Sequence, residues 1–388
     1  MRPGQPRRVL IYAGGRHGVG HSVRAGRLAA QLLGQHSDLV VLLLVPIAHE
    51  LLVRHPRMII CRLRAVQQYL GDVHRMVAAI ESSDAAPGYR EPSSSEQDAA
   101  AKEILGAMHE FMPSVFMSTQ FDGLVGELAK VLPAARNLGV NTVLLARDSH
   151  PRADFEYRGA ARFRDLLSLY DDVLILGDEW ASTRVHPEIG KRLANGTARL
   201  SGYVLPRIGR PRMRFSESHF NVLIQFGGGL ASRTELVGVL EVLDQMRQIS
   251  GRQVTAHLYP GAFTGHVSCD SPESFGFVRR HRWTPDAWEA RNYNLVVSRS
   301  GYNSAMEAYV RLRPTVLLPW RLKGSEQLDR AVHMSEVSPL VSVAVDFEGL
   351  SSCVRAALVG PSSDAGAYRV RKIPLLKFDG DLPWRRAR

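Results

Sequence analysis

The sequence predicts an α/β protein made of two doubly wound domains, each built on its own parallel sheet. Short apolar runs of strand length alternate with stretches of helical periodicity along most of the chain. One opening, a strand followed by a glycine-rich loop and a helix, occurs near residue 8 and again near residue 222. The chain has 388 residues, more than one ordinary hydrophobic core accommodates, so two domains are expected.

The composition limits the classes of partner. The net charge of +11 is explained by an arginine-rich composition alone, by attraction to anionic substrates, or by peripheral contact with an anionic membrane surface. The basic residues are scattered and no nucleic-acid module occurs, so no nucleic-acid partner is expected. The cysteines (Cys61, Cys269 and Cys353) form neither a zinc pattern nor a disulfide framework. The basic start is followed by an apolar run too short for a secretory leader, so a cytoplasmic location is expected.

The first domain opens with a strand over residues 8–12, a glycine-rich loop, and a helix over 22–33. Gly18 and Gly20 lie in the loop, together with His21 and, three residues further, Arg24. A dinucleotide-binding fingerprint is the alternative interpretation, but Val23 occupies the position of its third glycine. The next strand, 39–45, also lacks the acidic residue that would hold a ribose.

The strand and helix alternation then continues to residue 205. Strands are expected at 58–62, 114–117, 142–146 and 172–176, and helices at 66–82, 99–111, 124–138 and 157–170. The polar, serine-rich stretch 83–98 is interpreted as a mobile loop or a surface insertion. We assign residues 1–205 to the first domain, 206–219 to a linker, 220–371 to the second domain, and 372–388 to a segment that packs back on the first domain or frays.

The second domain repeats the opening with a strand at 222–226, the triplet Gly227–Gly229 and a helix at 232–249. A strand at 254–259 follows, and residues 278–283 and 284–292 lead to the next unit. The organising unit is a strand at 295–298, the turn Ser300-Gly301, a helix at 304–312 and a strand at 315–319. The polar residues Gly324 to Gln327 follow that strand, at the same edge of the sheet as the turn. Open parallel sheets bind ligands at this edge, and helix N-termini favour anions.

An ordered set of short motifs adds a resemblance that covers most of the chain and is strongest over residues 220–335. The motifs are Gly18-x-Gly20-His21-x-x-Arg24, Arg147-Asp148, Gly177-Asp178, Ser201-Gly202-Tyr203-Val204-x-x-Arg207, Gly227-Gly228-Gly229, and Ser300-Gly301-Tyr302-Asn303 with Glu307, Glu326 and Gln327. Together they resemble a family of predicted bacterial glycosyltransferases of the GT-B fold, similar to the enzyme that adds N-acetylglucosamine to lipid-linked muramyl peptide.

The resemblance implies a nucleotide-sugar donor held mostly by the second domain, across a cleft from the first. Glu307 matches the acid that holds the ribose hydroxyls. Glu326 and Gln327 match a Gln-Gln pair that contacts the donor sugar, and the acid in the first position leaves the sugar open. The first glycine loop carries an insertion, Arg16-His17, so the acceptor need not be a lipid-linked muramyl peptide.

Sugar transfer needs a group that accepts the proton of the acceptor and groups that stabilise the leaving diphosphate. His21, Asp148 and Asp122 are the candidate bases, and His21 is favoured because its pKa class suits neutral pH. His21 has two alternative roles, donation to a phosphate oxygen or capping of the loop. For Asp148 the alternative is a structural ion pair with Arg147.

The expected donor site follows from the motifs and their positions at strand ends. Its residues are Gly18, Gly20, Arg24, Gly227, Gly228, Gly229, Trp283, Ser300, Gly301, Tyr302, Asn303, Ser304, Glu307, Gly324, Ser325, Glu326 and Gln327.

Several of these residues have plainer structural explanations. Ser304 and Glu307 have the spacing of a capping box, and Glu326 and Gln327 fit an ordinary solvated helix start. Arg24, Arg207 and Arg299 contact phosphates or are surface charges. Trp283 and Trp288 flank the base or belong to the core. The pair Asp379-x-Asp381 resembles a metal motif but lies in a terminal loop, so no metal and no cofactor is expected.

The sequence therefore predicts a glycosyltransferase, inverting and metal-independent, that uses a UDP- or dTDP-sugar. The acceptor is the hydroxyl or amine of a small molecule, such as a secondary metabolite, or of a cell-envelope precursor. A nucleotide-sugar epimerase on the same fold and a non-catalytic sugar-nucleotide binding protein are the alternatives.

Overall fold

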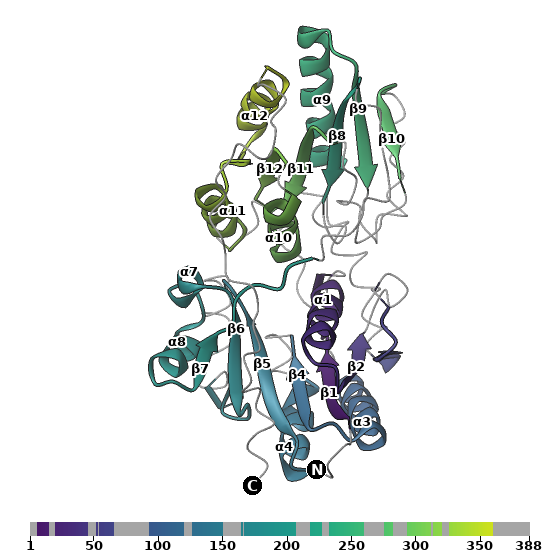
Figure 1. The fold of residues 1–388 in the computed structure, drawn as a ribbon, viewed down its shortest axis with the longest axis vertical. Helices are drawn as coiled ribbons and strands as arrows, with labels where there is room; N and C mark the ends of the chain where they lie inside the picture. Colours follow the sequence, from purple (N-terminus) through teal and green to yellow (C-terminus); the bar gives the residue numbers. More distant parts are fainter. Residues whose placement is uncertain are drawn as a thin grey trace. The chain divides into compact units, whose positions relative to one another are not determined.

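In the computed structural model the chain divides into two units, each with one parallel sheet (Figure 1). Among the described residues, the first unit holds those up to Val204 and the second those from Leu205 onward. The structure describes residues 6–14, 20–45, 52, 54–65, 93–119, 126–149, 164–165, 167–206, 218–226, 233–259, 275–281, 293–311, 313–319 and 326–359. Most of the proposed linker and all of the 372–388 segment lie outside these ranges.

The first unit contains a seven-stranded sheet in the order β3-β2-β1-β4-β5-β6-β7. Its strands are β1 (Arg7–Tyr12), β2 (Leu39–Val45), β3 (Met58–Arg62), β4 (Val115–Ser118), β5 (Asn141–Arg147), β6 (Asp172–Leu176) and β7 (Ala198–Leu200). Its helices are α1 (Gly20–Gln35), α3 (Ser94–Phe111), α4 (Leu128–Asn137), α7 (Glu179–Ser182) and α8 (Pro187–Ala194). Each described strand pair is parallel, as expected for strands that are apolar on both faces.

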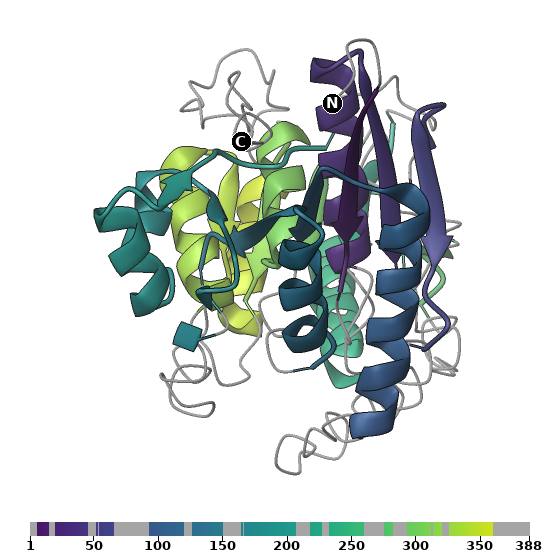
Figure 2. The same ribbon diagram turned by 90° about the horizontal axis from the view of Figure 1, so that it is seen from below.

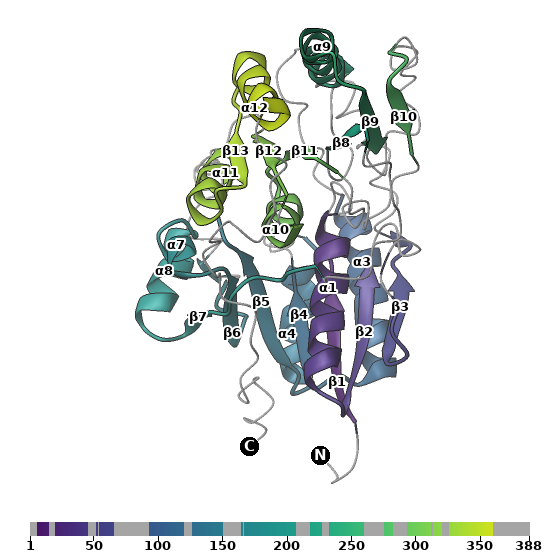
Figure 3. The same ribbon diagram turned by 45° about the horizontal axis from the view of Figure 1, so that its top comes forward.

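Helices cover both faces of this sheet. Helix α1 lies on one face, and α3 and α4 lie on the other, where they pack side by side (Figures 2 and 3). The core on the α3 and α4 side includes Leu10, Phe116 and Leu144 from three neighbouring strands. The central strands are therefore fixed from both sides, which holds their carboxyl ends in place.

Helix α3 begins at Ser94, inside the stretch expected to be a loop up to residue 98. Ser93 is its N-cap: the Ser93 hydroxyl accepts from the Glu96 N–H, and the Glu96 carboxylate accepts from the Ser93 N–H. This is a capping box, which satisfies two donors at the helix start. The loop prediction for 94–98 is wrong because serine-rich composition was given more weight than this spacing; residues 83–92 lie outside the described part.

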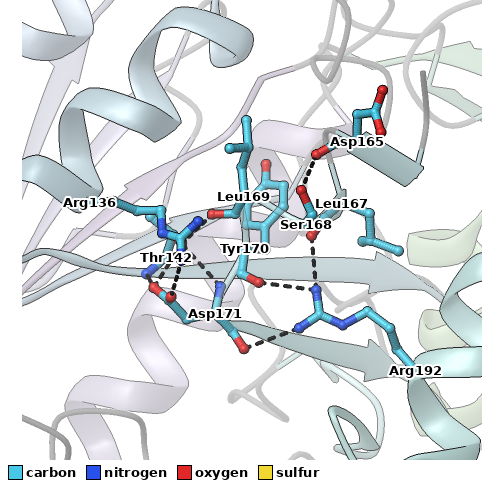
Figure 4. A network of polar contacts seen from close by, with 9 residues as sticks. All are labelled: Arg136, Thr142, Asp165, Leu167, Ser168, Leu169, Tyr170, Asp171 and Arg192. Carbon is cyan, nitrogen blue, oxygen red and sulfur yellow. Dashed lines mark hydrogen bonds and ion pairs between the residues drawn. The ribbon is translucent and has the colours of Figure 1, made fainter. Parts of the chain in front are cut away.

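A polar network fastens the opposite, amino edge of the sheet (Figure 4). The Arg192 guanidinium on α8 donates to the carbonyls of Leu167, Tyr170 and Asp171 at 2.9–3.1 Å. The Asp171 carboxylate accepts from the N–H and hydroxyl of Thr142 at 2.8 and 3.0 Å. These bonds connect the starts of β5 and β6 to α8. The network does not involve the carboxyl ends of these strands.

The second unit contains a six-stranded sheet in the order β10-β9-β8-β11-β12-β13. Its strands are β8 (Phe220–Gln225), β9 (Val254–Tyr259), β10 (Val278–Arg280), β11 (Leu295–Arg299), β12 (Thr315–Leu318) and β13 (Val341–Val343). Its helices are α9 (Arg233–Ser250), α10 (Tyr302–Arg311), α11 (Glu326–Val337) and α12 (Phe347–Val359). Helices α9 and α12 pack together over one core, and α10 packs against α11. The prediction of two doubly wound α/β domains is confirmed.

Candidate functional site

Each sheet has a point where the chain reverses its direction of winding. The order places β1 beside β4 in the first sheet and β8 beside β11 in the second, with crossovers leaving in opposite directions. Loops that follow such neighbouring strands diverge, and the crevice between them at the carboxyl ends is the usual ligand site of an open parallel sheet. Residues that follow β1, β4, β8 and β11 are therefore the ones placed to contact a ligand.

The turn between β11 and α10 lies at the reversal point of the second sheet. Ser298 is paired with Gln225 in the register, so Ser300 and Gly301 continue directly beyond the end of the strand. The helix starts cleanly, with the Ala305 N–H donating to the Gly301 carbonyl at 2.9 Å. The first N–H groups of such a helix have no acceptor within it and favour an anion.

Ser300 adds a buried hydroxyl to this turn. Its exposed fraction is 0 %, and its Oγ has no hydrogen-bond partner among the residues that the structure describes. A buried polar group without a partner costs about 1–3 kcal/mol. A ligand oxygen at the turn would supply the missing partner, which makes Ser300 a polar group suited to bind one.

Gly301 is a glycine that the surrounding fold does not require. Its φ lies outside the left-handed region, and a β-carbon built on it meets no atom of the described residues within 4 Å. The usual structural reasons for glycine, a strained backbone or a tight contact, are therefore missing in this part of the chain. Close approach of a ligand to the backbone is a further reason for glycine.

Arg299, beside the turn, is not a surface charge. Its side chain is 6 % exposed, forms an ion pair with Glu235 on α9, and lies over the Phe226 ring at 5.5 Å. Arg299 therefore connects the end of β11 to helix α9 and to Phe226, the residue that follows β8. Arg207 lies outside the described residues.

Glu307 is not part of a capping box. Helix α10 begins at Tyr302, so Ser304 is already inside the helix and cannot be its N-cap. Glu307 is 4 % exposed and lies one turn before Arg311. Burial lowers the pKa of the Arg311 guanidinium to about 10, and the Glu307 charge opposes this shift. The ribose contact of Glu307 remains a prediction.

Helix α11 brings a further residue to the turn. Glu326 and Gln327, half-buried, are its first two residues, as the motif placed them. Arg330, about one turn further, is 1 % exposed, and its Nη1 donates to the Ser300 carbonyl at 3.1 Å. Arg330 is not among the site residues predicted from the sequence. Its spacing could have predicted its burial, because Arg330 lies on the same side of α11 as the buried residues Met334 and Val337.

In the first domain, His21 and Arg24 lie on the first turns of α1, at the reversal point of that sheet. Arg24 is 3 % exposed, and its Nη2 contacts the Thr119 carbonyl at 2.8 Å and His21 Nδ1 at 3.2 Å. Thr119 directly follows β4. The interpretation of Arg24 as a surface charge is therefore wrong.

The contact with Arg24 also constrains the imidazole of His21. A guanidinium only donates hydrogen bonds, so His21 Nδ1 accepts. In a neutral ring the proton then lies on Nε2. With this contact in place, Nε2 donates a hydrogen bond rather than accepting a proton, which favours the anion-contacting role of His21 over the role of base.

Two other motif residues of the first domain, Asp178 and Ser201, have structural hydrogen-bond partners. Asp178 is the N-cap of α7, and its Oδ1 accepts from the Trp180 N–H at 3.1 Å and the Tyr203 hydroxyl at 3.0 Å. The Ser201 hydroxyl donates to the Ile175 carbonyl at 2.8 Å. Asp148 directly follows β5 and is fully buried. It lies beside Gly177: a β-carbon added at Gly177 would be 3.3 Å from the β-carbon of Asp148.

The structure places only part of the predicted site. The described residues include His21, Asp148, Gly20, Arg24, Ser300–Ser304, Glu307, Glu326 and Gln327. Outside them lie Asp122, Gly18, Gly227, Gly228, Gly229, Trp283, Trp288, Gly324 and Ser325.

Two features are absent from the described residues, a metal-binding group and a membrane span. The described residues contain no group of three or more His, Cys, Asp or Glu side chains that could hold a metal ion. Within the same part of the chain, no helix has the length and apolar character needed to span a bilayer.

Comparison with known proteins gives matches at the level of structure. No protein-family model matches the chain, and no curated protein matches it by sequence. A UGT transferase from Siraitia grosvenorii in complex with UDP is 13 % identical, with a TM-score of 0.54 over 92 % of each chain. Os79 from O. sativa, in complex with U2F and trichothecene, is 15 % identical, with a TM-score of 0.58 over 91 % of each chain. MurG of Acinetobacter baumannii is 13 % identical, with a TM-score of 0.51 over 93 % of this chain and 94 % of that one.

These similarities extend over most of the chain in every case. The chain therefore has the GT-B fold that these transferase structures share, and the fold implied by the resemblance is confirmed. Identities of 13–15 % do not carry the donor, the acceptor or the roles of residues across.

Proposed function

We propose that the protein is a glycosyltransferase that moves a sugar from a UDP- or dTDP-sugar to a hydroxyl or amine of a small molecule. The observation that carries the proposal is the Ser300-Gly301 turn at the reversal point of the second sheet. It combines the start of α10, a buried hydroxyl without a partner among the described residues, and a glycine that the surrounding fold does not need. Two of the similar structures contain UDP or U2F, which supports a nucleotide-linked donor.

The turn suits the charge that develops in sugar transfer. The acceptor oxygen attacks the anomeric carbon, the bond from that carbon to the nucleotide diphosphate breaks, and the electron pair leaves with the diphosphate. Helix N–H groups and the Ser300 hydroxyl stabilise that charge without a metal ion. Glu307 holds the ribose, and Glu326 and Gln327 contact the sugar, as the family resemblance implies.

The acceptor side is assigned to the first domain. We assign His21 to a hydrogen bond from Nε2–H to an anionic oxygen of a substrate, because Arg24 occupies its Nδ1. The proton of the acceptor then passes to a carboxylate, for which Asp122 and Asp148 are the candidates. Inversion at the anomeric carbon follows if the acceptor attacks in one direct step.

A ligand screen tests the proposal. Melting temperature is measured with UDP, dTDP, CDP, GDP and their sugars, and we expect UDP or dTDP compounds to raise it, since binding to the folded state alone stabilises it. Glu307→Gln should weaken this response and Glu336→Gln, on the exposed end of α11, should leave it unchanged. The proposal is wrong if none of the UDP or dTDP compounds shifts the transition.

The same screen leads to the test of reaction type. An epimerase would convert the donor sugar with no acceptor present, which NMR of the sugar nucleotide detects. A transferase leaves the donor sugar unchanged, apart from slow hydrolysis, until an acceptor is added. A protein that binds UDP-sugars but turns over none of a broad acceptor set would be a binding protein.

A further inference from the structure

A buried arginine lies behind the proposed phosphate-binding turn. Arg330 is 1 % exposed and is among the largest fully buried side chains of the described residues. Its Nη1 donates to the carbonyl of Ser300 at 3.1 Å. Burying a guanidinium costs several kcal/mol unless hydrogen bonds and charges around it compensate that cost. The Ser300 carbonyl is one of the acceptors that do so.

The bond fixes the orientation of the peptide between Ser300 and Gly301. The carbonyl and the N–H of a trans peptide point in opposite directions. Because Arg330 holds the carbonyl, the Gly301 N–H points away from the Arg330 guanidinium, just before the start of α10. A charged donor on the carbonyl also polarises the peptide and strengthens its N–H as a donor.

Arg330 belongs to the same helix as the residues assigned to the donor sugar. Gln327 and Glu326 precede it by three and four positions, which places all three on one side of α11. Helices α10 and α11 pack against each other. One rigid element therefore carries both the sugar contacts and the group that orients the phosphate-binding turn.

We infer that Arg330 is a positioning residue for the donor diphosphate: it holds the Ser300–Gly301 peptide so that its N–H faces the phosphates. This inference rests on the proposed function. It predicts that Arg330 contributes to the affinity for the diphosphate and not to that for the nucleoside, because the carbonyl to which it donates belongs to the turn assigned to the diphosphate.

The test compares UDP with uridine by isothermal titration calorimetry on wild type, R330M and R330K, in the full chain. Arg355→Met, on the exposed side of α12, is the matched control. We expect R330M to bind UDP at least tenfold more weakly while its affinity for uridine changes less than twofold. Lysine keeps the charge without the planar fork of the guanidinium, so R330K should lose about three- to tenfold for UDP.

The outcomes separate the inference from the function on which it rests. Equal weakening of UDP and uridine would assign Arg330 a merely structural role, and unchanged UDP binding would remove any role; either overturns the inference while leaving the function in place. If R330M does not fold, the same comparison on R330K decides. A wild-type protein that binds neither UDP nor dTDP overturns the proposed function, and this inference with it.

Discussion

Gly301→Ala is the substitution that separates a ligand requirement from a folding requirement. A β-carbon at this position meets no described atom within 4 Å, and the backbone is not in the left-handed region. The folding cost is then limited to the preference of a helix start for glycine over alanine, which is below about 1 kcal/mol. We therefore expect the melting temperature to fall by only a few degrees.

The binding cost should be much larger. Hydrogen bonds to charged groups contribute about 1.5–3 kcal/mol each, and a methyl group at the turn would displace at least one phosphate oxygen from its donor. Since 1.4 kcal/mol corresponds to a factor of ten, UDP affinity should fall by roughly 10- to 100-fold. Titration calorimetry with UDP and thermal unfolding without ligand measure the two quantities separately.

Gly190→Ala on α8 is the control, because a β-carbon there also meets nothing within 4 Å. It should leave UDP affinity unchanged. Wild-type affinity in Gly301→Ala would refute the assignment of the turn to the diphosphate. A loss of stability of several kcal/mol would instead show that the fold itself requires this glycine.

Three further predictions concern stability. Burial lowers the pKa of His257 to about 4, with a further contribution from His281, so the folded state binds fewer protons than the unfolded state below the usual value of 6.5. Stability is therefore retained above pH 6.5 and lost as the pH falls to 4, by up to about 3 kcal/mol, and denaturant titrations of H257Q should show a weaker dependence. Gly177→Ala should destabilise the fold by about 1–3 kcal/mol, because the new β-carbon would lie 2.6 Å from that of Ala181. Gly106→Ala in α3 is the control: its β-carbon has open space, so chemical denaturation should show a neutral or stabilising effect. Arg192→Met should cost about 2–3 kcal/mol in the same assay, because it removes three hydrogen bonds from a charged donor, although the Leu167 carbonyl still accepts from the Tyr170 N–H. An unchanged midpoint would contradict the role of that network.

The strands were readable from the sequence because central parallel strands are apolar on both faces. Apolar runs such as residues 39–45 and 295–298 are too short for buried helices and fit the buried centre of a parallel sheet, and they form β2 and most of β11. Helix starts were less readable. Helix α3 starts five residues earlier than expected, since serine-rich composition was given more weight than capping geometry. Helix α10 starts two residues earlier than expected, at Tyr302, so the capping-box spacing of Ser304 and Glu307 does not mark its start.

The candidate site was readable only where a motif marks a strand end. Ser300 and Gly301 stand out because a serine and a glycine interrupt an apolar pattern. Arg330 does not stand out, because an arginine on a helix is normally exposed, and its burial depends on how α11 packs. The same holds for Arg24, whose interpretation as a surface charge the structure corrects.

The two arginines occupy comparable places in the two domains. In the sheet orders, β4 and β11 are the equivalent strands, each beside the first strand of its own domain. Arg24 donates to the carbonyl of Thr119, directly after β4, and Arg330 donates to the carbonyl of Ser300, directly after β11. They come from different helices, α1 and α11, so the likeness is not inherited from one repeated motif. In each domain, therefore, a buried guanidinium donates to the carbonyl of a residue that follows this strand, and in both cases that residue lies at the reversal point where an open parallel sheet usually binds its ligand.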